Sequence, residues 1–402
     1  MKRVPELPVD VQAGGRLQDI LCQPLQPYST EALAYLAALS QRLMASPALR
    51  THPDVAAFAY WCRSSNLARL SRAFANKGPR LGRGLVFHIA PSNVPVNFAF
   101  SMAFGMLAGN ANIVRIPWVL HPQVTLISLE MQSLFDAPEH SRIAAMTRLV
   151  RYPRNDEITE ALSQACHARM LWGGDATIGH MRTMRTAPRC VDIAFADRYS
   201  LCVLGAQAVL DADERCLADL TTGFYNDVFF LDQNACSSPH LVVWQGAPDT
   251  VEAAMLRFWG AVHRVLDTKD ILAPIHAVDK YVHLCRAALA MPECIGANWQ
   301  DNRIHRVRLC ELPAGIEDHR GRHGFFLEYA APDLGGLKAI VGERYQTLTY
   351  FGVMPDDIIQ FVVREGLTGI DRVVPVGKAL DMGVIWDGYD LIASLSRVIA
   401  NT

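Results

Sequence analysis

The stretch GLVFHIAPSNVPVNFAFSMAFGMLAGNANIVRI, residues 84–116, decides the fold of this chain. It starts with a short apolar run over 84–90, continues with an apolar helical segment over 95–108, and ends in a β-rich run over 112–116. Gly109 can close the helix in the left-handed conformation that glycine adopts at little cost. A strand, a crossover helix and a second strand form the unit from which parallel sheets are built.

Short β-rich runs and helical stretches continue to alternate beyond this segment. Further strands are predicted at residues 147–152, 168–172, 189–195 and 200–205, and a helical layer over 30–75 precedes the series. Strands that are separated by crossover helices predict a doubly wound parallel sheet, which binds ligands at the carboxyl ends of its strands.

A second α/β series follows from about residue 207. We therefore expect an N-terminal helical layer with a dinucleotide-binding domain over 1–206, a catalytic domain over 207–370, and a C-terminal segment over 371–402. Residues 299–329 are charged and alternating, which is typical of an exposed strand pair or an interface ribbon.

Composition excludes several classes of function. The 402 residues, 50% hydrophobic and 19% charged, suffice for two packed domains, and a net charge of −2 without a long basic run argues against nucleic-acid binding. The ten cysteines stand singly, without the paired spacing of a zinc site, so no metal is expected. Small molecules are the expected ligands.

The sequence predicts a soluble cytoplasmic protein. Its N-terminus, MKRVPELPVD, lacks the apolar core of a secretory signal. The longest apolar stretch, 94–108, is interrupted by Asn97 and Ser101 and is too short to span a bilayer. Unpaired cysteines fit a reducing compartment. We expect no membrane span and a homo-oligomer.

Two segments of the first domain could bind a cofactor. Pro91, Ser92 and Asn93 follow a strand and precede a helix, where Asn93 could act chemically or serve only as the helix N-cap. A later strand delivers Arg115 to the same edge of the sheet, where it could reach a phosphate.

A third segment, ARMLWGGDATIG, places Trp172, Gly173 and Gly174 between a strand and a helix N-terminus. Such a turn can face a diphosphate, although glycine-rich strand-to-helix turns are common in α/β sheets. In the second domain, Cys236 of NACSS lies between a long helix and a strand, with small polar neighbours. A thiolate there could be nucleophilic; the alternative is a buried loop cysteine.

Taken in order, PSNVP, AGNANIVR, WGGDATIG and NACSS resemble the aldehyde dehydrogenase superfamily. The closing GIDRVVPVGKALDMGVIWDGYDLI, residues 369–392, is similar to one branch of it, the LuxC-type acyl-CoA reductases. The resemblance covers the chain from about residue 50. It implies an aldehyde dehydrogenase-like α/β fold, with a doubly wound cofactor domain and a second, catalytic α/β domain.

The resemblance also implies roles for single residues. Cys236 matches the catalytic cysteine, and Asn93 matches the asparagine that donates to the oxyanion. Arg115 stands where the family has a lysine on the adenosine ribose, and Trp118 replaces a glutamate that many NAD-preferring members carry. Since that replacement removes a charge that would repel a 2′-phosphate, we expect NADPH as the cofactor.

Glu343 and Tyr345 resemble a Glu-x-Phe element in which the carboxylate holds the nicotinamide ribose and the ring packs beside the nicotinamide. A surface glutamate and a core tyrosine are the alternatives. One departure bears on the direction of the reaction. Phe195 stands near the place of the glutamate that activates water in oxidising members, with only Asp197 close by.

We therefore expect NADPH-dependent reduction of an acyl thioester to an aldehyde, through an acyl group carried on Cys236. The acyl donor could be acyl-CoA, an acyl carrier or an acyl-transferring partner enzyme. The alternatives are an oxidising aldehyde dehydrogenase with Asp197 as its base, an acyltransferase or hydrolase that pairs Cys236 with His240, and a scaffold subunit without activity.

Overall fold

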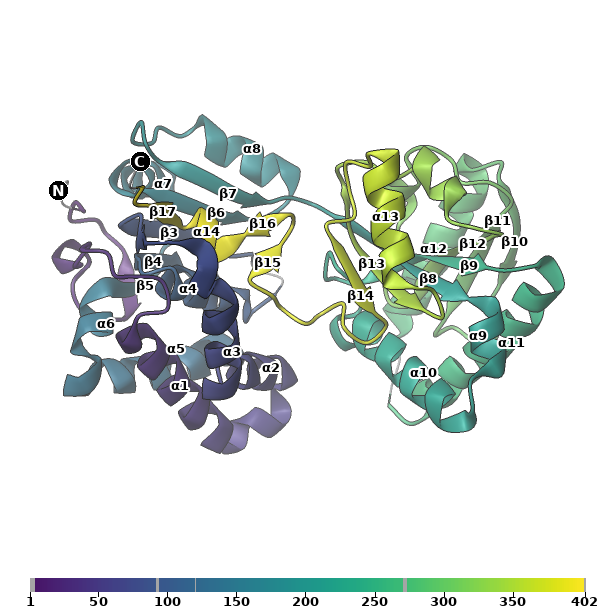
Figure 1. Ribbon diagram of the computed structural model, residues 1–402, viewed down its shortest axis with the longest axis horizontal. Coiled ribbons are helices and arrows are strands. Elements are labelled where there is room, and N and C mark those ends of the chain that lie inside the picture. Colours follow the sequence, from purple (N-terminus) through teal and green to yellow (C-terminus); the bar gives the residue numbers. More distant parts are fainter. Residues whose placement is uncertain (1–3, 92–93, 120, 270–272, 401–402) are drawn as a thin grey trace. The chain divides into compact units, whose positions relative to one another are not determined.

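The computed structural model describes residues 4–91, 94–119, 121–269 and 273–400. The chain folds into two compact units, which Figure 1 shows. Unit 1 comprises Met1–Ala196 together with Met382–Thr402, and unit 2 comprises Asp197–Asp381.

Unit 1 is built on a six-stranded sheet in the order β1-β5-β4-β3-β6-β7. Its described strands pair in parallel, except for β1 and β5. Their bounds are β1 (Asp10–Ala13), β3 (Leu85–Ile89), β4 (Ala111–Arg115), β5 (Thr147–Arg151), β6 (Ala168–Trp172) and β7 (Val191–Phe195). From β3 the chain winds first towards β5 and then back towards β7, which creates a topological switch point beside β3. The predicted doubly wound parallel sheet is confirmed.

Helices cover both faces of this sheet, with one apolar cluster against each face. Every residue of α4 except Phe100 is buried, as expected of the apolar crossover between β3 and β4. The helices of the unit are α1 (Thr30–Ala45), α2 (Pro53–Trp61), α3 (Ser64–Phe74), α4 (Asn97–Leu107), α5 (Pro122–Phe135), α6 (Ser141–Met146), α7 (Asp156–Ala165), α8 (Asp175–Thr183) and α14 (Leu391–Ser394).

The end of the chain returns to unit 1. There, β17 (Ser396–Val398) pairs antiparallel with β2 (Arg80–Gly82), after a short hairpin of β15 (Ile385–Trp386) and β16 (Tyr389–Asp390). The Arg80 guanidinium donates to the carbonyls of Ala393 and Ser396. The predicted C-terminal segment over 371–402 is therefore divided, since Met382–Thr402 belongs to unit 1 and the residues before it belong to unit 2.

Unit 2 contains a seven-stranded sheet in the order β10-β11-β12-β9-β8-β13-β14, in which only the described β10 and β11 pair antiparallel. Its strands are β8 (Tyr199–Gly205), β9 (Pro239–Gln245), β10 (Cys294–Asn298), β11 (His305–Leu309), β12 (Phe325–Ala331), β13 (Tyr345–Phe351) and β14 (Arg372–Pro375). Its helices are α9 (Ala206–Asp211), α10 (Glu214–Val228), α11 (Pro248–Asp267), α12 (Pro274–Ala290) and α13 (Pro355–Glu365). An apolar cluster lies on each face of the sheet.

Two features differ from the sequence-based expectations. The strand β8 pairs with β9 and β13, so the chain enters unit 2 at Asp197 and not after residue 206. The expectation of an exposed ribbon over 299–329 is wrong for β12, which lies between β9 and β11 inside the sheet. Its Glu328 is fully buried, and its carboxylate accepts hydrogen bonds from the indole nitrogens of Trp244 and Trp259 at 3.0 and 2.7 Å.

No helix in the described part of the chain combines the length and the apolar character that a membrane span requires.

Candidate functional site

Cys236 lies in a short loop between the 3-10 turn η5 (Phe229–Leu231) and β9. Asp232 and Gln233 both have left-handed backbone conformations, with φ of 52° and 58°. The buried Gln233 amide anchors the loop, because its Oε1 accepts from the N–H groups of Gly324 and Phe325 at 2.8 and 3.2 Å. Its Nε2 donates to the carbonyls of Pro239 and Phe325, each at 3.1 Å. The loop is thus fixed to the start of β12, and Cys236 itself is partly exposed.

Two side chains from neighbouring strands hold Cys236. The Ser200 hydroxyl of β8 donates to the Cys236 carbonyl at 2.7 Å and accepts from the Thr347 N–H at 3.2 Å. The Gln346 amide of β13 donates from Nε2 to Cys236 Sγ at 3.8 Å. Gln346 is fully buried, and the Thr347 hydroxyl donates to its Oε1 at 3.3 Å, which orients the amide with its N–H groups towards the sulfur.

The buried Asp227 supports the same loop through its backbone carbonyl. The Ser238 hydroxyl donates to the Asp227 carbonyl at 2.7 Å, and the Asp227 carboxylate accepts from the N–H groups of Gly377 and Ala379 at 2.6 and 2.9 Å. Burial raises the pKa of Asp227 to about 7, against the lowering effect of these two hydrogen bonds. Asp227 therefore links the end of α10 to the segment after β14.

His240 does not have the environment of a general base. It is buried in β9, and its ring stacks on Tyr199 with 5.6 Å between the ring centroids. Burial lowers the pKa of His240 to about 3, so the imidazole is neutral at neutral pH. The side chain belongs to the core of unit 2, which weakens the Cys236–His240 alternative.

Unit 1 contains a cavity of about 310 Å³ at the carboxyl ends of its strands. Its lining residues are Ile89, Arg115, Arg154, Asn155, Asp156, Thr159, Ala176, Thr177, His180, Met181 and Met184. The Arg115 guanidinium lies over Tyr152 at 4.7 Å, and its buried Nε has no hydrogen-bond partner among the described residues. Nearby, the Arg151 guanidinium lies 5.3 Å from the ring of the exposed Trp118. The cavity is therefore lined by two cationic side chains, those of Arg115 and Arg154, and Arg115 is the residue that was expected to reach a phosphate.

The glycine-rich turn opens α8 beside this cavity. Gly174 is the N-cap of α8 and makes no side-chain cap, with φ of −68°. A Cβ atom at Gly174 would meet nothing within 4 Å, whereas one at Gly173 would lie 3.3 Å from Thr177. The protein itself thus leaves open space at Gly174, which suits the approach of a ligand to the helix N-terminus.

Trp172 differs from its two glycine neighbours because its side chain is buried. Its ring stacks on Phe195 at 3.7 Å, and its Nε1 donates to Ser101 at 3.0 Å. Ser101 also contacts His88 Nδ1 at 2.8 Å, and His88 Nε2 contacts Asn112 Oδ1 at 3.0 Å. Burial lowers the pKa of His88 to about 4, so a neutral imidazole that donates from Nε2 satisfies every member. Trp172 can therefore offer a ligand only its backbone.

The remaining predicted residues are placed as follows. Pro91 lies half-buried just beyond β3, whereas Ser92 and Asn93 lie outside the described residues. Glu343 is exposed, and its carbonyl accepts from Arg198. Tyr345 is 1% exposed, packs on Tyr199 at 5.1 Å and donates to Glu317 at 3.4 Å, so its ring serves the core of unit 2.

Sequence reasoning missed three residues around Cys236. Gln346 directly follows Tyr345 in a strand, Ser200 opens another strand, and Asp227 lies inside a helix. The one available signal was Asp227, a carboxylate on the buried and largely apolar face of α10. The other two reach Cys236 only through the pairing of β13 with β8 and of β8 with β9.

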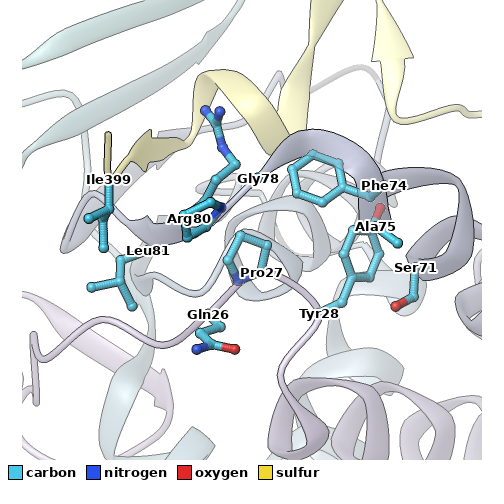
Figure 2. A pocket seen from close by; sticks show the side chains of 11 residues that line it. Gln26, Pro27, Tyr28, Ser71, Phe74, Ala75, Gly78, Arg80, Leu81 and Ile399 are labelled. Atoms are coloured by element: carbon cyan, nitrogen blue, oxygen red, sulfur yellow. The ribbon is translucent and has the colours of Figure 1, made fainter. Parts of the chain in front are cut away.

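A separate hollow of about 360 Å³ lies in unit 1, and Figure 2 shows its lining. Pro27, Tyr28, Phe74, Leu81 and Ile399 supply apolar walls. The Arg80 side chain extends away from them towards the C-terminal segment, to which it is hydrogen-bonded. None of the predicted site residues lines this hollow.

Part of the chain is similar to proteins of one family. Residues 69–265 match the family model "Acyl-CoA reductase (LuxC)". The long-chain acyl-protein thioester reductase of Vibrio harveyi is 27% identical over 171 residues, which is 41% of this chain and 32% of that protein. The enzyme of the same name from Photorhabdus luminescens is 24% identical over 168 residues, with the same shares. These matches span about a third of each relative's length.

Solved structures resemble most of the chain. A proline utilization A mutant from Bradyrhizobium japonicum has a TM-score of 0.63 at 14% identity, covering 93% of this chain and 42% of that one. An NAD-dependent benzaldehyde dehydrogenase from Corynebacterium glutamicum has a TM-score of 0.61 at 12% identity, covering 93% and 84%. A putative aldehyde dehydrogenase from Burkholderia cenocepacia has a TM-score of 0.60 at 16% identity, covering 87% and 79%. The predicted aldehyde dehydrogenase-like fold is confirmed.

Proposed function

On the premise that residues 69–265 form a domain of the LuxC family of acyl-CoA reductases, we propose that this protein reduces an acyl thioester to an aldehyde. The observation that carries the proposal is the setting of Cys236. Cys236 is a partly exposed residue on an anchored loop, and its sulfur accepts a hydrogen bond from the amide N–H of the buried Gln346. A nucleophile needs such a fixed position and access to its substrate.

The proposed reaction begins when the Cys236 thiolate attacks the carbonyl carbon of the acyl thioester. The new carbon–sulfur bond replaces the bond to the leaving thiol, which departs as a thiolate and takes up a proton. A reduced nicotinamide cofactor, when bound, would supply the hydride for the acyl carbon, and Cys236 would hold the resulting tetrahedral oxyanion. Collapse of the oxyanion releases the aldehyde and restores the thiolate.

We propose two donors for the oxyanion, the Cys236 N–H and the Asn93 amide. The role of Asn93 is proposed only from its matching position in the aldehyde dehydrogenase superfamily, because Asn93 lies outside the described residues. Loss of one such donor typically costs about 3 to 4 kcal/mol of transition-state stabilisation. If Asn93 serves chiefly the oxyanion of the hydride step, Asn93→Ala should lower turnover more than it lowers acylation of Cys236.

For the cofactor we propose NADPH, held in unit 1. Pro91, Gly173 and Gly174, with the backbone of Trp172, would line the approach to the α8 N-terminus, and Arg115 would pair with the 2′-phosphate. The buried and unpartnered Nε of Arg115, the open space at Gly174 and the nearby Arg154 fit an anionic ligand. Glu343 and Tyr345 do not enter this proposal, because the exposed carboxylate and the buried ring offer no joint surface for a nicotinamide riboside.

The acyl donor is proposed as an acyl thioester of CoA or of a protein. The name of the relatives, long-chain acyl-protein thioester reductase, favours a long chain and a protein-bound thioester. A partner enzyme that transfers acyl groups could supply such a substrate.

The oxidising alternative needs a base that activates water. Phe195 is 4% exposed and stacked on Trp172. The Asp197 carboxylate forms ion pairs with Arg320 and, at 3.8 Å, with Arg344. A carboxylate that is held by two guanidinium groups is not free to orient an attacking water molecule, so these contacts favour the reductive direction.

Paired assays of the purified protein test the proposal. With acyl-CoA of graded chain length, NADPH should be oxidised and aldehyde released, and with aldehyde and NADP⁺ but no thiol, little acid should form. Rapid acid formation in the second assay would favour the oxidising alternative. Acyl release without any cofactor would favour the hydrolase, and failure to bind a dinucleotide would favour the scaffold.

A further inference from the structure

We propose that α12 and the edge strand β10 form a docking surface for a second copy of this chain, with the two α12 helices antiparallel. Both elements belong to unit 2 and are labelled in Figure 1. The surface centres on a row of exposed apolar side chains, which we call the α12 stripe: Ile275, Val278, Val282, Cys285 and Leu289. This inference does not depend on the proposed activity.

The exposure of the α12 stripe is unusual for a helix that already has a buried face. Leu284 and Ala287 are 8% and 1% exposed and pack into the core of unit 2. By contrast, Val278 is 57% exposed and Leu289 is 88% exposed. A surface helix of a monomer normally turns a polar face to solvent. A second apolar stripe on the outer face therefore indicates a further contact.

The spacing of the stripe identifies the kind of contact. Its members follow one another at intervals of three, four, three and four residues, from Ile275 to Leu289. This alternation gives the 3.5-residue repeat with which helices pack against each other as coiled coils, and the β-branched Val278 and Val282 suit such a seam. The expected occupant is therefore another helix.

The charges that flank the α12 stripe indicate that the helix packed against it is α12 of a second copy. Asp279 and Arg286 are exposed, lie one heptad apart on the same side of the stripe, and form no ion pair within the described ranges. In an antiparallel pair of identical helices, each flanking position faces its own counterpart position, so the acid of one copy meets the base of the other. The register that sets Val278 opposite Leu289 and Val282 opposite Cys285 brings Asp279 near Arg286 of the second copy, twice by symmetry. The α12 surface is thus complementary to itself.

The neighbouring strand supports the same arrangement. β10 is in contact with α12 and forms the edge of the seven-stranded sheet. Its residues Ile295–Asn298 are exposed, and its sequence CIGAN contains neither the proline nor the lysine that commonly protects an edge strand from pairing. Trp299, 51% exposed, follows directly. An antiparallel partner strand could therefore extend this sheet across the same two-fold axis.

Sedimentation of the full chain over a range of concentrations tests the inference. The wild type should form a dimer. Val282→Asp and Leu289→Asp should shift it to monomer, because each buries a carboxylate in the seam, while the melting temperature stays near that of the wild type since both side chains are exposed. Ala288→Asp, an exposed position beside the stripe, is the matched control for added charge and should weaken the dimer less.

A charge exchange separates self-association from other occupants. Asp279→Arg and Arg286→Asp should each weaken the dimer about tenfold, because each places like charges opposite each other. The double variant should recover wild-type affinity. A monomeric wild type would overturn the inference, since it would leave the stripe open or covered by another part of the same chain. The inference would also be overturned if Val282→Asp and Leu289→Asp left the dimer affinity unchanged, or if the double charge variant did not recover the wild-type dimer affinity.

Discussion

Gln346 Nε2 lies 3.8 Å from Cys236 Sγ, and the Thr347 hydroxyl holds the amide in that orientation. We predict that Gln346→Leu slows alkylation of Cys236 by iodoacetamide about tenfold at neutral pH, because an N–H donor to a charged sulfur is lost. The alkylation rate should reach half its maximum at a higher pH than in the wild type. Peptide mapping by mass spectrometry identifies the modified cysteine.

The matched control is Gln360→Leu, the same change at an exposed position of α13. It should leave the alkylation profile unchanged. If Gln346→Leu alkylates Cys236 with the wild-type pH profile, the amide only fills space beside the sulfur. Because this test needs no substrate, it stands apart from the proposed reductase activity.

Arg115→Glu should weaken NADPH far more than NADH, because it places a carboxylate where the 2′-phosphate is proposed to lie. Fluorescence titration with both cofactors measures the two losses. Arg151→Glu, on the neighbouring Trp118, provides a comparison outside the lining of the cavity. Equal losses for NADPH and NADH in Arg115→Glu would remove the basis for the NADPH assignment.

Gly174→Ala should weaken cofactor binding without loss of stability. The structure has room for the added methyl group and an ordinary backbone conformation at this residue, so only a ligand at the α8 N-terminus would be displaced. Gly179→Ala, in the middle of α8 and equally free of contacts, is the control, and it should raise the free energy of unfolding by up to about 1 kcal/mol. Equal cofactor affinity in both variants would place the dinucleotide elsewhere.

Asp227 should make the stability of the protein depend on pH. Burial raises its pKa from 3.8 to about 7 in the folded chain, so its contribution is complete below pH 3.8 and is lost as the pH rises through about 7. Asp227→Asn, which resembles the protonated carboxyl, should remove this decline. Urea unfolding of both proteins from about pH 5 to about pH 8 measures the difference in slope. A difference in unfolding free energy that does not change across this range would contradict a raised pKa.

The doubly wound sheet could be predicted because its strands are apolar on both faces and alternate with apolar helices; all five residues of β3 are buried. The loop of Cys236 stood out through its small polar neighbours. Gln346 could not be predicted, because it lies 110 residues from Cys236 in sequence and nothing in the residue pattern of its strand distinguishes it. Only the pairing of β8 with β9 and β13 brings the two together. Likewise, the charged and alternating pattern of residues 299–329 predicted an exposed ribbon, because the sequence does not show that Trp244 and Trp259 donate hydrogen bonds to the buried Glu328.

The acyl group carried on Cys236 is the central claim of the proposed mechanism. Incubation of the wild type with mass-tagged acyl-CoA, without cofactor, should label Cys236 with one acyl group per chain, removable by hydroxylamine. Added NADPH should discharge the label as aldehyde. Cys236→Ala should neither accept the label nor form aldehyde, while it still binds NADPH. A label on another cysteine, or aldehyde formation by Cys236→Ala, would contradict the account.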